Sequence, residues 1–150
     1  MDRYKILGQV APKDVNAAVL LYSVPQTLAT EYDNGSTVTT NPKVAAVVTQ
    51  TVVSSIVVTN MVFGNSVYNI YLFDNSTDTT PDVAGGGTNG GLNNLVYNRT
   101  IGAWDTHTLD LGLVLPPDAT IRCKSNKVAV EATPTGVNFT AMGIETRLQY

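Results

Sequence analysis

Few residues of this chain could carry nucleophilic catalysis. The sequence has one histidine, His107, and one cysteine, Cys123, and the acids Asp105 and Asp110 flank the histidine. A catalytic triad would use His107 as the base, Cys123 or a serine as the nucleophile, and one acid to orient the imidazole. The alternation of its neighbours places His107 at the start of a strand beside Trp104, where a structural imidazole is expected. Cys123 falls on the inward face of a predicted strand, as a small buried apolar side chain would. We therefore expect no catalytic residue and no enzymatic activity.

Two loop segments contain residue types that bind ions. Asp74, Asp78 and Asp82 recur every four residues, but they lack the alternate spacing, central Gly and final Glu of a calcium-binding loop. The stretch "GGGTNGG", from Gly85 to Gly91, lacks the Lys-Ser/Thr ending and the following helix of a phosphate-binding loop. We expect solvated, turn-forming loops here, with no metal and no cofactor.

Aromatic side chains near predicted loops offer a different kind of site. Tyr97 and Trp104 could form a platform on which a sugar ring stacks. The alternative is that such aromatics cap the ends of a hydrophobic core.

Composition indicates a β protein with an unusually uncharged surface. The 150 residues include 20 Val and 20 Thr but only 5 Lys and 3 Glu, a bias toward side chains that suit strands. Charged residues make up 14%, against about 25% in typical globular proteins. The length suits a single domain, 1–150. A surface with so few charges is suited to a protein whose neighbours in an assembly cover much of it.

Charge and hydropathy argue against several classes of partner. The net charge is −3, and no basic cluster extends beyond Arg122, Lys124 and Lys127, so nucleic acid is not expected as a partner. The opening "MDRYKILGQV" lacks the apolar stretch of a signal peptide, and no run reaches the roughly 18–20 apolar residues of a membrane helix. We expect synthesis in the cytoplasm and no membrane partner.

Alternating apolar and polar residues, separated by Gly, Pro, Asn and Asp, predict an antiparallel β-sandwich of the jelly-roll or immunoglobulin-like type. Residues 108–115 form the clearest strand, with four leucines on one face. Segments 66–73, 119–124 and 127–133 alternate in the same way. In the last segment, 136–149, the apolar phase shifts to Met142 and Ile144 beside Gly143, which predicts a β-bulge there.

The segment "TVVSSIVVTN", Thr51 to Asn60, is apolar on both faces. Its alternation predicts Val52, Ile56 and Val58 on one side and Val53 and Val57 on the other. A strand buried on two sides belongs in the middle of an assembly, under a flap of its own chain or against another subunit.

Two segments look like insertions between strands. Asn34-Gly35 and Asn41-Pro42 predict a hairpin arm over Leu28 to Gln50. Asp74 to Asn94 holds five Gly without periodicity and predicts a long surface loop.

Five segments carry a resemblance to a known group of proteins. In order they are "YKILGQVAP", "LLYSVPQT", "VVSSIVVTN", "LGLVLPPDATIRC" and "FTAMGIE". This ordered set resembles small virion structural proteins of tailed bacteriophages, particularly those of cyanobacteria, and covers the ends and middle of the chain. The arm and the Gly-rich loop lengthen the usual form.

The resemblance implies a β-sandwich that assembles, often as a homotrimer, on the outside of a capsid or on the neck, tail or baseplate. The implied partners are other copies of the chain and the major capsid protein or neck and tail proteins. The alternative function is a virion module that recognises host-surface glycans. We expect the docking surface to combine the arm with the N-terminal segment and the central strand; its residues are Tyr4, Ile6, Leu7, Val10, Tyr32, Val38, Val53 and Val57.

Overall fold

The structure, a computed structural model, describes residues 4–15, 17–25, 47–74, 94–127 and 136–148. Within these ranges the regular elements are eight strands, and no helix occurs. Accordingly, no helix among them has the length and apolar character needed to cross a membrane. The strands are β1 (Tyr4–Val10), β2 (Val19–Ser23), β3 (Val47–Asn60), β4 (Ser66–Phe73), β5 (Asn94–Ile101), β6 (Thr106–Leu115), β7 (Thr120–Ser125) and β8 (Val137–Leu148).

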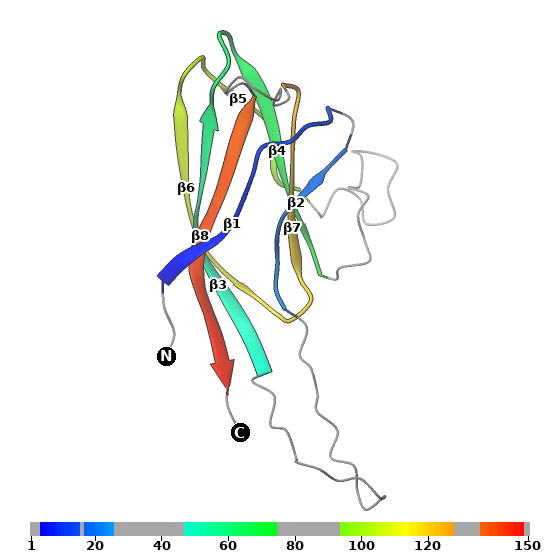
Figure 1. The fold of residues 1–150 in the computed structure, drawn as a ribbon, viewed down its shortest axis with the longest axis vertical. Helices are drawn as coiled ribbons and strands as arrows, with labels where there is room; N and C mark the ends of the chain where they lie inside the picture. The colour runs from blue at the N-terminus through cyan, green and yellow to red at the C-terminus, as the bar shows by residue number, and fades with distance from the viewer. Residues whose placement is uncertain (1–3, 16, 26–46, 75–93, 128–135, 149–150) are drawn as a thin grey trace, which may run out of the picture.

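The strands form two antiparallel four-stranded sheets that face each other (Figure 1). Sheet A has the order β1-β8-β3-β6, and sheet B has the order β2-β7-β4-β5. Within the sheets β1 pairs with β8, β2 with β7, β3 with β6, and β4 with β5. The chain is thus one long hairpin folded back on itself and rolled into two layers, which is the eight-stranded jelly roll. The predicted β-sandwich is confirmed, and the strand order selects the jelly roll over the immunoglobulin-like arrangement.

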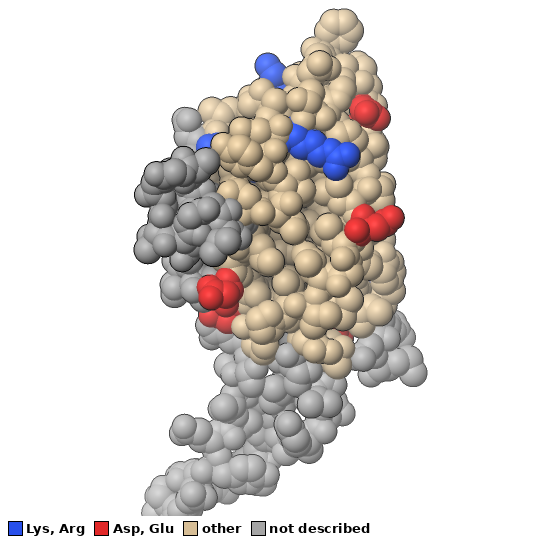
Figure 2. Space-filling model, turned by 180° about the vertical axis from the view of Figure 1, so that it is seen from behind, with Lys and Arg blue, Asp and Glu red and all other residues tan. Residues whose placement is uncertain are grey.

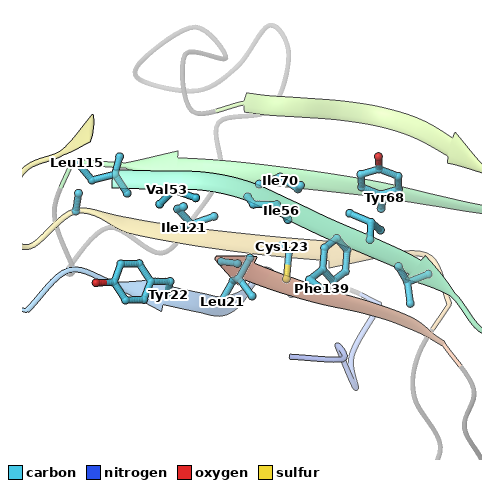
Figure 3. Packing of buried hydrophobic residues seen from close by; sticks show 14 of the residues in the cluster. Leu21, Tyr22, Val53, Ile56, Tyr68, Ile70, Leu115, Ile121, Cys123 and Phe139 are labelled. Atoms are coloured by element: carbon cyan, nitrogen blue, oxygen red, sulfur yellow. The ribbon is translucent and has the colours of Figure 1, made fainter. Parts of the chain in front are cut away.

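The core fills the space between the two sheets (Figure 3). Sheet A contributes Val53, Ile56 and Phe139, all fully buried, and sheet B contributes Ile70 and Ile121. Fully burying a side chain of this size stabilises the fold by about 1.5–3 kcal/mol. The alternation predicted for residues 108–115 is confirmed, because the leucines of β6 pack on or against this core.

Glycines allow the backbone to approach closely at two points. A Cβ at Gly8 would collide with the carbonyl oxygen of Leu21, where β1 of sheet A passes β2 of sheet B. A Cβ at Gly143 of β8 would collide with the carbonyl oxygen of Val52 in β3.

The predicted bulge beside Gly143 is wrong. β8 keeps one phase from Val137 to Gly143, and the register slips in its partners instead, between Ile6 and Gly8 and between Val53 and Ser55. The bare backbone of Gly143 lets the distorted part of β3 fit against an undistorted β8.

The ends of the predicted insertions lie inside strands. Val47 to Gln50, assigned to the arm by sequence, belongs to β3, where Val47 pairs with Leu148. The remainder of the arm, most of the Gly-rich loop and most of the predicted strand 127–133 lie outside the described residues.

Candidate functional site

The outer face of sheet A, which points away from sheet B, carries a row of apolar side chains across all four strands. Tyr4 of β1 lies opposite Ile144 of β8, Ile144 lies opposite Val52 of β3, and Val52 lies opposite Val114 of β6. Residues directly opposite each other on neighbouring strands share a face and touch. The row is therefore a continuous apolar band.

A second apolar pair extends this band along the strands. Ile6 of β1 lies opposite Met142 of β8. The Ser54 hydroxyl lies 3.1 Å from the carbonyl oxygen of Met142 and 2.9 Å from the hydroxyl of Tyr4, which fixes the tyrosine over β3. Tyr4, Ile6 and Val114 are 55%, 59% and 60% exposed, so their burial within one copy of the chain is incomplete. We call these residues the apolar patch; its members are Tyr4, Ile6, Val52, Val114, Met142 and Ile144.

The other half of the same face is polar. The amide of Gln9 donates a hydrogen bond of 3.0 Å to the hydroxyl of Thr140, and a bond of 3.4 Å joins the hydroxyls of Thr59 and Thr106. Val57 lies among these residues, between Thr140 and Thr108 of the neighbouring strands. A polar margin beside an apolar centre is the usual organisation of a protein interface.

Charge on this face is confined to its edges. Between Val52 and Thr59 of β3 and between Asn138 and Thr146 of β8, every outward-facing residue is uncharged. Asp110 lies on the edge strand β6. Charged side chains are also few and isolated on the side of the molecule seen from behind (Figure 2).

A salt bridge lies at the end of the sheet beside the apolar patch. The Nζ of Lys5 lies 2.8 Å from one carboxylate oxygen of Glu145, whose side chain is almost fully buried. The hydroxyl of Tyr22 donates a hydrogen bond of 2.7 Å to the other oxygen and lies 2.9 Å from the hydroxyl of Thr51. The network connects β1, β2, β3 and β8, so it ties the two sheets together and leaves little free charge beside the patch.

The structure separates the residues that the sequence assigned to a docking surface. Tyr4, Ile6 and Val57 lie on the outer face of sheet A. Leu7 and Val10 pack against the core, and Val53 is fully buried within it. Tyr32 and Val38 lie outside the described residues.

The assignment of Val53 to a surface that meets another subunit is wrong. The slip between Val53 and Ser55 reverses the phase of β3, so Val53 joins Ile56 and Val58 on the inner face. Val52, which the sequence placed with Ile56, faces outward instead.

Sequence reasoning missed four members of the apolar patch. The sequence placed Met142 and Ile144 in the apolar phase after the expected bulge, and it grouped Val52 with Ile56 and Val58. Val114 was placed on the solvent-facing side of its strand but was not included in the docking surface. An unbroken alternation from Val137 to Thr146 would have identified the two β8 residues. No sequence signal identifies Val52, because its orientation depends on a bulge set by the partner strand.

The two ring nitrogens of His107 face Tyr68 and Asp105. The Nδ1 of His107 makes a 3.0 Å hydrogen bond with the hydroxyl of Tyr68, and its Nε2 lies 3.8 Å from Asp105, beyond hydrogen-bonding distance. Burial raises the pKa of the Tyr68 phenol, and the nearby guanidinium of Arg99 offsets part of the rise. The tyrosine hydroxyl therefore remains protonated at neutral pH.

The Cys123 thiol is buried in the core between the sheets. Burial raises its pKa well above the ordinary value, so the thiol is protonated at neutral pH and is a poor nucleophile. The inward orientation predicted for Cys123 is confirmed.

The aromatic residues that the sequence singled out do not cap the core. Tyr97 and Trp104 are 57% and 64% exposed. Sequence reasoning did not consider Phe63, which is 90% exposed and follows the end of β3.

Comparison with known proteins gives no assignment for this fold: the chain matches no protein-family model, no curated protein and no solved structure.

Proposed function

We propose that this chain is a structural protein of a bacteriophage particle. It assembles on the exterior of the particle, as a homotrimer, and serves as a capsid decoration protein or as a component of the neck, tail or baseplate. The ordered motifs of the sequence suggest this group of proteins. The observation that carries the proposal is the apolar patch on the outer face of sheet A.

The jelly-roll fold agrees with the proposal without deciding it. Viral capsid proteins, lectins and cupins all use this fold, and a fold by itself does not specify a function. The choice among them therefore depends on the surface of the molecule.

The chemistry of the patch favours contact with further copies of the same chain. From Val52 to Thr59 of β3 and from Asn138 to Thr146 of β8, no outward side chain is charged, so copies can approach here without repulsion between like charges. Contact between copies would cover Tyr4, Ile6 and Val114, which a single chain leaves more than half exposed. Exposed apolar patches of a few hundred Å² are often functional.

The apolar patch is too small to form a standard protein interface alone. The patch extends across four strands spaced about 4.8 Å apart and along about five residues of each strand, which gives an area of roughly 300 Å². A standard interface buries about 800 Å² on each partner. The patch is therefore the apolar centre of the proposed contact, and the polar residues around Gln9 and Thr140 belong to its margin.

Quantitative mass spectrometry of purified particles tests the proposed function. We expect the chain at high copy number, in a multiple of three relative to a component of known stoichiometry. Its absence from particles purified through a density gradient would contradict the proposal. Detection of the chain only in the infected-cell lysate would do the same.

A further inference from the structure

A fully buried side chain, Asn60, holds together two loops at one end of the sandwich. Its Nδ2 donates hydrogen bonds of 2.9 Å to the carbonyl oxygens of Gly64 and Gly102. Gly64 belongs to the β3–β4 loop (residues 61–65), and Gly102 belongs to the β5–β6 loop (residues 102–105). Because one amide nitrogen binds both carbonyls, the two loops lie side by side. Figure 1 shows both connections at the upper end of the molecule, away from the start of β3 and the end of β8.

Further hydrogen bonds make this arrangement rigid. The Oδ1 of Asn60 accepts bonds from the backbone nitrogen of Val62, at 3.2 Å, and from the hydroxyl of Ser66, at 3.0 Å. The backbone nitrogen of Asn60 donates to the carbonyl oxygen of Asp105 at 2.9 Å. Because buried hydrogen bonds that share a side chain must break together, the loops are held in one relative position.

Each of these loops presents one large aromatic side chain to solvent. Phe63 precedes Gly64 and is 90% exposed, and Trp104 follows Gly102 by two positions and is 64% exposed. Neither ring belongs to the hydrophobic core.

The backbone at Trp104 is strained. The backbone nitrogen of Asp105 donates to the carbonyl oxygen of Gly102 at 3.2 Å, which closes a four-residue turn with Trp104 in the third position. Trp104 has φ +59°, in the left-handed region that this turn position normally reserves for Gly or Asn.

Among the described residues, the other non-glycine positions with positive φ are Asn98 and Asp118, which are residue types that tolerate it. Trp104 therefore has an unfavourable backbone conformation, and its large aromatic side chain is unfavourably exposed to solvent. Backbone strain that burial of the side chain does not offset is characteristic of functional positions.

The polar residues on the two loops indicate the kind of ligand. Asn65 and Asp105 are exposed on the same two loops. One carboxylate oxygen of Asp105 accepts a 2.8 Å hydrogen bond from the backbone of Thr106, and it retains lone pairs toward solvent. A surface that combines aromatic faces with amide and carboxylate oxygens suits a ligand that is apolar on one face and hydroxylated at its margin.

We propose that Phe63 and Trp104 form a binding site for a neutral carbohydrate. A pyranose presents a face of C–H groups that packs on the electron-rich face of an aromatic ring, and its hydroxyls can donate to Asp105 and Asn65. The Asp105 carboxylate disfavours an anionic sugar. Insertion into a lipid bilayer would leave that carboxylate without water. This site lies at a loop end and does not depend on the proposed assembly through sheet A.

The single tryptophan makes the site directly observable, because all tryptophan fluorescence of the chain comes from Trp104. We expect a saturable fluorescence change when the intact protein is titrated with neutral oligosaccharides of glucose, galactose, mannose or N-acetylglucosamine. Phe63→Ala should weaken the binding by about tenfold or more, as loss of a central aromatic contact does. Tyr97→Ala, which removes an exposed aromatic on β5, is the matched control and should bind as the unmodified chain does.

Three results would overturn the proposal. The first is that no sugar gives a saturable fluorescence change and that no glycan on an array of neutral glycans gives a signal. The second is that Phe63→Ala and Tyr97→Ala weaken sugar binding equally. The third is that phosphatidylcholine vesicles, and not sugars, shift the tryptophan emission to shorter wavelength.

Trp104→Gly distinguishes a binding role from a structural one. Glycine relieves the left-handed strain, so the melting temperature should rise by about 2–4 °C, while sugar binding measured by calorimetry should be lost. A lower melting temperature for this variant would show that Trp104 stabilises the loop, and retained binding would show that its ring is not a contact.

Discussion

Both faces of sheet A carry large apolar side chains, but the two sets have different surroundings. On the inner face, Val53, Ile56 and Phe139 are fully buried against sheet B. On the outer face, Val52 and Met142 come from the same two strands and are only partly buried. The difference shows that the apolar content of a strand is greater than one core requires. We attribute the excess on the outer face to assembly.

The largest difference between the faces is expected for large-to-small substitutions within β8. Phe139 contacts the ring of Tyr68 edge-on, with centroids 5.9 Å apart, and is fully buried. Phe139→Ala should lower the free energy of unfolding by about 3–5 kcal/mol because it leaves a cavity in the core.

Met142→Ala, three residues away on the outer face, should cost less than about 1 kcal/mol in the isolated chain. Equilibrium unfolding in urea, at a protein concentration low enough to prevent association, measures both values. Comparable losses for the two variants would show that the outer face is covered within a single chain.

Gly143 lets the distorted part of β3 pack closely against β8, and it is the next position to test. Gly143→Ala places a Cβ against the carbonyl oxygen of Val52 and should destabilise the chain by about 1–3 kcal/mol through overpacking. The control is Gly102→Ala, whose Cβ would meet Asp105 at an ordinary 3.8 Å. The control should be neutral or slightly stabilising, by up to about 1 kcal/mol. If Gly143→Ala is equally well tolerated, close packing at Gly143 does not set the register of β3 and β8.

An effect confined to high pH is expected from two buried groups between the sheets. Burial raises the pKa of Cys123 above its ordinary 9.0 and that of Tyr68 above its ordinary 10.0. Because both pKa values are higher in the folded chain, the stability that the protonated thiol and phenol contribute is complete below about pH 9. This contribution is lost as the pH rises further.

For each group, the free energy of unfolding should fall by about 1.4 kcal/mol per pH unit once the unfolded form has lost its proton. Urea unfolding between pH 7 and 11 measures the slope. Cys123→Ala should give a shallower slope than the unmodified chain. Equal slopes for Cys123→Ala and the unmodified chain would mean that the thiol does not contribute to the pH dependence of stability.

Sequence reasoning predicted the fold where the alternation of residues was regular. The four leucines of β6 repeat with period two and are oriented as predicted. Ile121 and Cys123 of β7 are buried as predicted, for the same reason.

Sequence reasoning failed where the orientation of a residue depends on a partner strand. The phase of Val53 depends on a register slip between β3 and its neighbours, and that slip is accommodated by Gly143, far away in the sequence. Trp104 was singled out from the sequence, but its association with the loop of Phe63 could not be predicted. The two loops that carry Phe63 and Trp104 are brought together by hydrogen bonds of Asn60, for which a single sequence holds no local signal.

Sedimentation equilibrium of the unmodified chain and of two charge variants tests the assembly through sheet A most directly. Ile6→Glu places a charge in the apolar patch on β1, and Leu20→Glu places the same charge at a comparably exposed apolar position on β2 of sheet B. We predict three times the 16.0 kDa chain mass for the unmodified protein and for Leu20→Glu, and the mass of a single chain for Ile6→Glu. A single-chain mass for the unmodified protein at all concentrations, or an Ile6→Glu variant that remains trimeric, would contradict this account.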